Sequence, residues 1–135
     1  MSVFGDIRRR SDGKAVRKED VHTYMSLEDM TWEDMAAKVA EEMKNGIVHF
    51  IYKKKDKKVR GTVIPGDERE AWGTKKMDIV DKIPHGGYCP PKEVGYTIYF
   101  DCDKGDWRAF RDERIIGFWT GSYDYDEYQD IKSEK

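Results

Sequence analysis

Cysteine is scarce in this chain of 135 residues, which contains only Cys89 and Cys102. Two cysteines without paired ligand spacing make neither a zinc motif nor the disulfide scaffold of a small secreted domain. The sequence also lacks an apolar run long enough to cross a bilayer, and no apolar stretch follows the charged residues 1–10 as it would in a signal peptide. We therefore expect a cytoplasmic protein without a membrane partner.

Recognisable catalytic patterns are missing as well. The chain shows no Ser-His-Asp order, no phosphate-binding glycine loop and no paired-acid motif. Asp101, Asp103 and Asp106 crowd one turn, but aspartate is favoured in turns because it accepts local backbone hydrogen bonds. His85 and the two cysteines lack the spacing of a zinc site. We therefore expect a protein that is not an enzyme and that has no metal and no cofactor.

The net charge is only −2, because the chain has 25 Lys and Arg residues and 27 Asp and Glu residues. No overall field therefore attracts nucleic acid, but the charges are unevenly distributed. We divide the chain into a flexible basic N-terminal arm (1–20), a helix plus small β-barrel domain (21–120) and an acidic, tyrosine-rich C-terminal tail (121–135). The 39% of charged residues against 38% of hydrophobic ones indicates a small core, in which aromatic residues supply much of the buried area.

Both ends of the chain leave alternatives open. The N-terminal arm, with Arg8-Arg9-Arg10, is either a solvated terminus or a phosphate contact. The tail is a disordered solubilising segment, a mimic of nucleic-acid charge that binds a basic partner, or a segment that folds back on the lysine-rich hairpin described below.

One helix is clearly indicated before the strands begin. Thr31 is a suitable N-cap, with Asp34 in the capping-box position, and Asn45-Gly46 is a strong stop signal. Between them, apolar residues recur at helical spacing. The pattern predicts an amphipathic helix over Trp32–Lys44, whose apolar stripe consists of Trp32, Met35, Ala36, Val39, Ala40 and Met43.

Short β segments with turn signals between them follow the helix. The most regular is Tyr96–Phe110, which reads as strand, turn and strand, with Gly105 free to adopt a positive φ. The pattern predicts further strands at 47–55, 59–64, 69–74 and 115–120, turns at 56–58 and 65–67, and an irregular connection at 75–94. A helix followed by five to six short strands predicts a mainly β (α+β) fold, a small Sm- or SH3-like β-barrel with one N-terminal amphipathic helix.

Three stretches of the sequence resemble a known family. They are Val48–Asp56 (Val-His-Phe-Ile-Tyr-Lys-Lys-Lys-Asp), Glu70–Thr74 (Glu-Ala-Trp-Gly-Thr) and Tyr99–Phe110 (Tyr-Phe-Asp-Cys-Asp-Lys-Gly-Asp-Trp-Arg-Ala-Phe). Together, over roughly Asn45–Phe118, they resemble the WYL-like, Sm-like SH3 β-barrel family of small phage and bacterial proteins, mostly of unassigned function. The inserted Val59–Arg69 departs from the pattern, as if one hairpin were lengthened. The resemblance implies a fold and a phage or bacterial origin but no catalytic residues.

Candidate ligand contacts come from a basic run and from arginines interleaved with aromatic residues. Lysines at a hairpin tip contact phosphates or simply keep an exposed edge soluble. On small barrels, aromatic rings stack on bases and nearby arginines hold phosphates. The candidates are Lys53, Lys54, Lys55, Lys57, Lys58, Arg60, Arg108, Arg111, Trp72 and Tyr99.

These residues predict a non-enzymatic binding module that engages nucleic acid or a nucleotide through the basic hairpin and the arginines. The alternative is a phage accessory (anti-defence) protein in the host cytoplasm. It would bind and inhibit a host protein through Lys75–Val94 and the acidic tail, or sequester a nucleotide immune signal. A homo-oligomer also remains open, because Sm-like barrels often pair through exposed strand edges.

Overall fold

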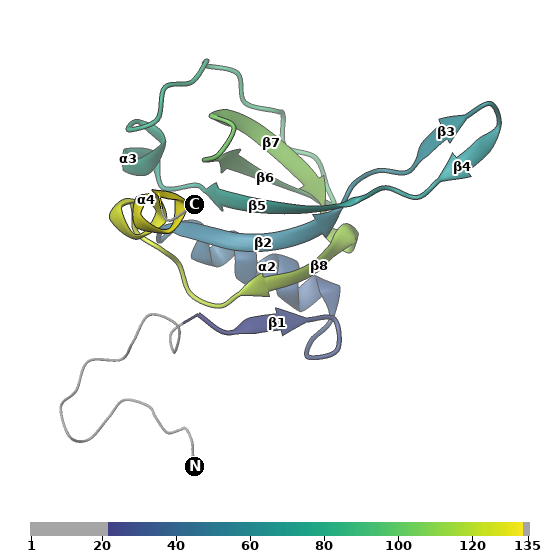
Figure 1. Cartoon of the computed structure of the whole chain (residues 1–135), viewed down its shortest axis with the longest axis horizontal. Helices are drawn as coiled ribbons and strands as arrows, with labels where there is room; N and C mark the ends of the chain where they lie inside the picture. The colour runs from purple at the N-terminus through teal and green to yellow at the C-terminus, as the bar shows by residue number, and fades with distance from the viewer. Residues whose placement is uncertain (1–21, 134–135) are drawn as a thin grey trace, which may run out of the picture.

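The computed structural model describes residues 22–133, which form a six-stranded antiparallel sheet in the order β1-β8-β2-β5-β6-β7 and a separate two-stranded ribbon, β3-β4 (Figure 1). The predicted mainly β fold is confirmed. Within the described residues the barrel does not close, since β1 and β7 are the two edges of the sheet. The strands are β1 (Tyr24–Ser26), β2 (Ile47–Lys53), β3 (Lys57–Val59), β4 (Thr62–Ile64), β5 (Glu68–Thr74), β6 (Tyr96–Asp101), β7 (Asp106–Arg111) and β8 (Ile115–Trp119), and the helices are α2 (Trp32–Glu42), α3 (Met77–Val80) and α4 (Tyr125–Ser133).

Helix α2 is the predicted N-terminal helix. The Thr31 hydroxyl accepts a hydrogen bond from the Asp34 N–H at 3.2 Å, so the predicted N-cap is confirmed. The helix ends at Glu42, with Met43 as its C-cap, slightly before the predicted Lys44. Its buried face packs on the sheet, and this contact fixes one side of the fold.

The sheet carries a core on each face, because β2 alternates its side chains between them. Val48, Phe50 and Tyr52 belong to the core that also contains the buried face of α2. Ile47 belongs to a second core, which includes residues of α3 and α4. Strand β2 is therefore covered on both faces, as its nearly continuous apolar sequence indicates.

Two β segments differ from the prediction. The segment 59–64 is not one strand, because the chain turns at Arg60-Gly61, where φ is 53° and 82°. Positive φ at two successive residues is the type I′ hairpin turn, which favours glycine at its second position. The turn predicted at 56–58 is therefore wrong. Tyr24–Ser26, interpreted as a connector, forms β1 and pairs with β8.

Within the predicted C-terminal tail, Tyr125–Ser133 form helix α4, which packs on the sheet and is not a solvated segment. Helix α4 places Tyr128 in the second core, where it is 8% exposed. Its Lys132 Nζ lies 3.0 Å from the Asp103 carboxylate. Helices α3 and α4 lie at the end of the sheet opposite the β3–β4 ribbon (Figure 1), so the idea that this segment folds back on the lysine-rich tip is also wrong. The predicted N-terminal arm lies outside the described residues.

Candidate functional site

The basic residues of the 53–66 segment lie on a hairpin that projects beyond the sheet (Figure 1). We call residues 53–66 the basic hairpin. It continues β2 outward, turns at Arg60-Gly61 and returns into β5. The segment contains six cationic side chains and one carboxylate, that of Asp56. The cationic residues are all exposed: Lys53, Lys54, Lys55, Lys57, Lys58 and Arg60.

Backbone and side-chain contacts fix the root of the basic hairpin. The Lys54 N–H donates to the Asp67 carbonyl at 2.8 Å, and the Gly66 N–H donates to the Asp56 carboxylate at 2.9 Å. The Arg114 guanidinium donates to the Lys54 carbonyl at 3.1 Å. A Cβ at Gly66 would lie 1.9 Å from that same carbonyl oxygen, so only glycine fits there. The hairpin therefore leaves the sheet in a defined direction.

A cleft of about 130 Å³ lies beside this root, where β2 meets the edge hairpin β6–β7. We call it the basic cleft. It brings Lys53, Lys54 and Lys55 together with Arg111, although these residues are far apart in the sequence. Aromatic and aliphatic groups complete its walls. Its full lining is Tyr52, Lys53, Lys54, Lys55, Tyr96, Ala109, Phe110, Arg111 and Arg114.

Tyr96 and Arg111 form one edge of the basic cleft as a cross-strand pair. The Arg111 guanidinium donates to the Tyr96 hydroxyl at 3.2 Å and lies 5.4 Å from the ring centroid. This hydrogen bond and the nearby Glu113 carboxylate raise the pKa of Arg111 above its usual value, so the cation persists at any ordinary pH. Arg114 keeps a buried Nε that has no hydrogen-bond partner within residues 22–133.

Sequence reasoning missed Tyr52, Tyr96 and Arg114 as members of this site. The register of the β6–β7 hairpin was a usable signal for Tyr96, because a four-residue turn over 102–105 places Tyr96 opposite Arg111. Tyr52 and Arg114 reach the cleft only through packing between β2 and the segment before β8. That proximity has no local sequence signal.

Arg108 lies away from the basic cleft. Its guanidinium is 3.9 Å from the Asp106 carboxylate, and it lines a second cavity of about 170 Å³ with Tyr88 and Trp107. The sequence grouped Arg108 with Arg111, but the structure separates them along β7. The interpretation of Arg108 as a ligand contact stays a prediction for this second cavity.

The candidate stacking residues Trp72 and Tyr99 are buried, with 5% and 0% of their surface exposed. Neither ring has a free face for a base, so this assignment is corrected: both belong to the core. The Tyr99 hydroxyl lies 3.2 Å from that of Tyr52, and burial raises the pKa of Tyr99. Trp72 stacks on the His49 ring, whose other face stacks on Trp119; the centroids are 3.9 and 3.8 Å apart.

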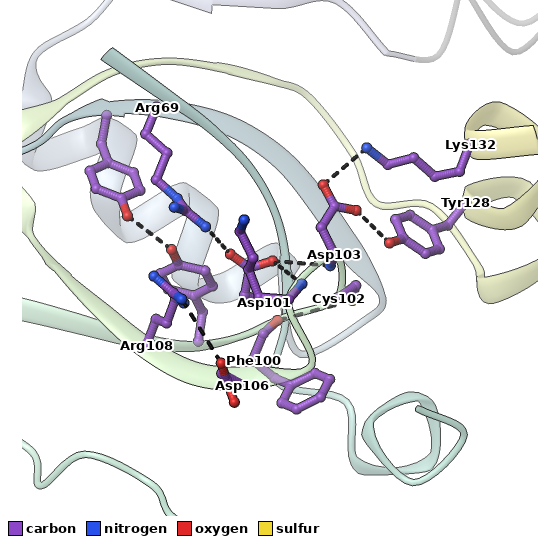
Figure 2. Close-up of polar contacts among 12 residues, drawn as sticks. Arg69, Phe100, Asp101, Cys102, Asp103, Asp106, Arg108, Tyr128 and Lys132 are labelled. Carbon is purple, nitrogen blue, oxygen red and sulfur yellow. Dashed lines mark hydrogen bonds and ion pairs between the residues drawn. The ribbon is translucent and has the colours of Figure 1, made fainter. Parts of the chain in front are cut away.

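The carboxylates at the β6–β7 turn accept hydrogen bonds from donors of the protein itself (Figure 2). Asp101, 1% exposed, accepts from the Arg69 guanidinium at 2.6 Å and from the N–H groups of Asp103 and Lys104 at 3.0 and 3.1 Å. Asp103 accepts from the Tyr128 hydroxyl and pairs with Lys132. In the described part of the chain, no group of three or more acidic, His or Cys residues is placed to hold a metal ion.

The structure is a small antiparallel β domain with a single N-terminal helix and a basic cleft at a sheet edge. These features define its class, an SH3-type β fold. The chain belongs to the WYL_2 family, described as having an Sm-like SH3 β-barrel fold, whose model matches residues 36–116. This match spans the basic hairpin and all of the residues that line the cleft, and it confirms the resemblance noted in the sequence. No curated protein and no solved structure matches the chain. Among residues 22–133, no helix has the length and apolar content needed to cross a membrane.

Proposed function

We propose that this protein is a non-enzymatic binding module that holds the phosphate groups of a nucleic acid or nucleotide in the basic cleft and along the basic hairpin. One observation carries the proposal. Cations from β2, from β7 and from the segment before β8 meet in a single cleft, directly below a projecting row of further cations.

The chemistry of the cleft suits a phosphate. Lysine and arginine donate charge-assisted hydrogen bonds to phosphate oxygens, and Arg111 is fixed in place by Tyr96. The Tyr96 ring is 37% exposed at the cleft edge, where a base or sugar can lie against it. At about 130 Å³, the cleft is smaller than the roughly 300–1,000 Å³ of pockets that enclose whole ligands. It therefore suits one phosphoryl group of a ligand that extends along the surface.

The test is a binding titration with labelled DNA, RNA and a nucleoside triphosphate at low and raised salt. We expect log affinity for DNA to fall by about 0.7–0.9 per contacted phosphate for each tenfold rise in salt. The variant Lys53→Gln/Lys55→Gln/Arg111→Gln should lose binding about tenfold or more. Its matched control, Lys38→Gln/Lys92→Gln/Lys104→Gln, removes three exposed cations away from the cleft and should bind normally. Absence of binding to all three ligands at low salt would refute the proposal.

A second candidate function is supported by the connection between α3 and β6. Together with the first residue of α3, this segment exposes three large apolar side chains: Met77, Tyr88 and Val94 are 54%, 72% and 103% exposed. Such a group favours a protein partner, including the host factor considered from the sequence. The variant Met77→Ser/Tyr88→Ser/Val94→Ser should then lose any partner that the wild-type protein captures from a bacterial lysate. A capture experiment that recovers no specific partner with the wild-type protein counts against this role.

A further inference from the structure

We propose that the ligand is double-stranded DNA and that the basic hairpin enters its major groove as a two-stranded arm. This inference rests on the proposed function and narrows its ligand class. It is carried by the shape, charge and exposed apolar residues of the hairpin beyond its root.

The dimensions of the hairpin match the groove. From the Lys54–Asp67 backbone bond to the turn at Arg60-Gly61 the chain advances about six residues, a reach of about 20 Å at roughly 3.3 Å per residue. Its two strands are about 4.8 Å apart. The major groove of B-DNA is about 12 Å wide and 8.5 Å deep and admits a two-stranded ribbon. The hairpin is thus long enough to reach the groove floor while its root stays outside.

Cations lie on both faces of the ribbon. Lys57 pairs across the strands with Ile64 and Lys58 with Val63, and paired residues point to the same face. Because successive residues alternate, Lys57 and Lys58 project from opposite faces. A ribbon with lysines on both faces can contact the phosphates on both walls of a groove at once. A flat surface would need its cations on a single face.

Apolar side chains accompany these lysines where no core covers them. Val59, Val63 and Ile64 are 48%, 59% and 46% exposed, and none belongs to either core of the sheet. Purely electrostatic phosphate binding does not need them. The floor of the major groove offers an apolar partner, because the methyl group of thymine projects into it. Because Ile64 shares a face with Lys57 and Val63 shares the opposite face with Lys58, each face of the ribbon offers a cation together with an apolar group. This combination suits a groove and not an isolated phosphate.

The hairpin is also organised before any ligand arrives. The type I′ turn matches the twist of the two strands, and the root is held by the Gly66–Asp56 hydrogen bond and by Arg114. A preformed arm loses less conformational freedom on binding than a loop that must fold on its target.

The same features separate DNA from other occupants. The major groove of A-form RNA is deep and narrow, so a ribbon does not enter it. A second copy of the hairpin would bring six more cations against the first six, which opposes pairing of the two tips. A single strand offers no two-walled groove to a ribbon with cations on both faces.

The experiment compares the affinity of the full chain for a DNA duplex, the RNA duplex of the same sequence and each DNA strand alone, at one salt concentration. We expect about a tenfold or greater preference for the DNA duplex. Methylation of guanine N7 by dimethyl sulfate, which reports the major groove, should be reduced in the complex. Equal affinity for duplex and single strands, or unchanged methylation at N7, would overturn the groove inference.

A matched pair of variants tests the apolar contribution. Val63→Ser/Ile64→Ser should weaken duplex binding by about threefold to tenfold and leave single-strand binding unchanged. The control Met77→Ser/Val94→Ser also replaces two exposed apolar residues, away from the hairpin, and should bind the duplex normally. If Val63→Ser/Ile64→Ser instead changes only the oligomeric state in sedimentation, these residues join copies of the chain and the inference fails.

The outcomes also separate this inference from the proposed function. Salt-dependent binding that is equal for duplex and single strands, or binding of nucleotides alone, preserves the proposed function and refutes the arm. Absence of binding to any nucleic acid or nucleotide refutes both.

Discussion

His49 occupies an unusual position for a titratable residue. Its ring lies between the indoles of Trp72 and Trp119, with interplanar angles of 11° and 7°, and its side chain is 12% exposed. Burial is the main influence and lowers the pKa of His49 below its usual value. The Glu70 carboxylate, 2.9 Å from Nε2, and the more distant Asp103 act in the opposite direction, while Lys132 adds to the lowering.

This position predicts that the protein loses stability as pH falls. The unfolded chain protonates its histidine near pH 6.5, whereas folded His49 protonates only at lower pH, so the unfolded state binds more protons in that interval. We expect the urea midpoint to decrease between about pH 7 and pH 5, before most carboxylates titrate. His49→Gln should flatten this part of the profile. A profile equally steep in both proteins would show that another group causes it.

The identity of the residues alone led to a wrong assignment of two aromatic side chains as base-stacking residues. Trp72 and Tyr99 belong to a series in which aromatic residues are interleaved with arginines, including Arg108 and Arg111, and such a series is also the pattern of a base-stacking surface. Their strand positions decide otherwise: Tyr99 points into the core with α2, and Trp72 into the second core. Which face of a strand is covered depends on packing from distant elements, so the sequence of one strand does not reveal it.

At the scale of elements, α4 shows where local signals were overlooked. The Glu127 N–H donates to the Asp124 carboxylate at 2.7 Å, and the Asp124 N–H donates to the Glu127 carboxylate at 3.0 Å. This reciprocal pair is a capping box, and its Asp-x-x-Glu spacing is visible in the sequence. The dense acidic and tyrosine content of 121–135 favoured a tail instead. By contrast, α2 and the β6–β7 hairpin were predicted correctly, since periodicity, caps and turns all agree there.

The contacts of α4 predict that it contributes to stability. Tyr128 packs in the second core and its hydroxyl donates to Asp103. We expect Tyr128→Ala to lower the free energy of unfolding by about 3 kcal/mol and Tyr128→Phe by about 1 kcal/mol, measured by urea denaturation. Tyr88→Ala is the matched control, because Tyr88 is 72% exposed and should change stability by less than about 0.5 kcal/mol. Equal effects of the two alanine variants would contradict the packing of α4.

At the scale of the whole molecule, the two cores and the projecting part of the basic hairpin use different residues. The two cores lie on the faces of the sheet, whereas the basic hairpin beyond its root contributes to neither. The mainly β fold with its N-terminal helix was predictable from strand patterns, turns and caps, although the sheet stays open. The cleft was predictable only in part, because three of its cations are consecutive in the sequence while Arg111 and Arg114 join them through the folded sheet.

This separation predicts a variant that folds normally but does not bind. Lys57→Glu/Lys58→Glu should weaken nucleic-acid binding by about tenfold or more, because it replaces two attractions by two repulsions. The melting temperature should stay within about 2 °C of the wild type, since both lysines are exposed and outside the cores. Circular dichroism and anisotropy titration measure the two quantities. A large fall in melting temperature would show that the hairpin supports the fold.

The fixed root of the basic hairpin also has a mechanical consequence. Strands β2 and β5 run directly into the hairpin and pair with each other over seven successive positions. The root bonds of Lys54 and Gly66 join the two strands where they leave the sheet. A pull on the tip at Arg60 therefore acts on both strands together and loads their ladder along its length. The basic hairpin is thus continuous with the central pair of strands, and a force applied at its tip is transmitted to the centre of the sheet.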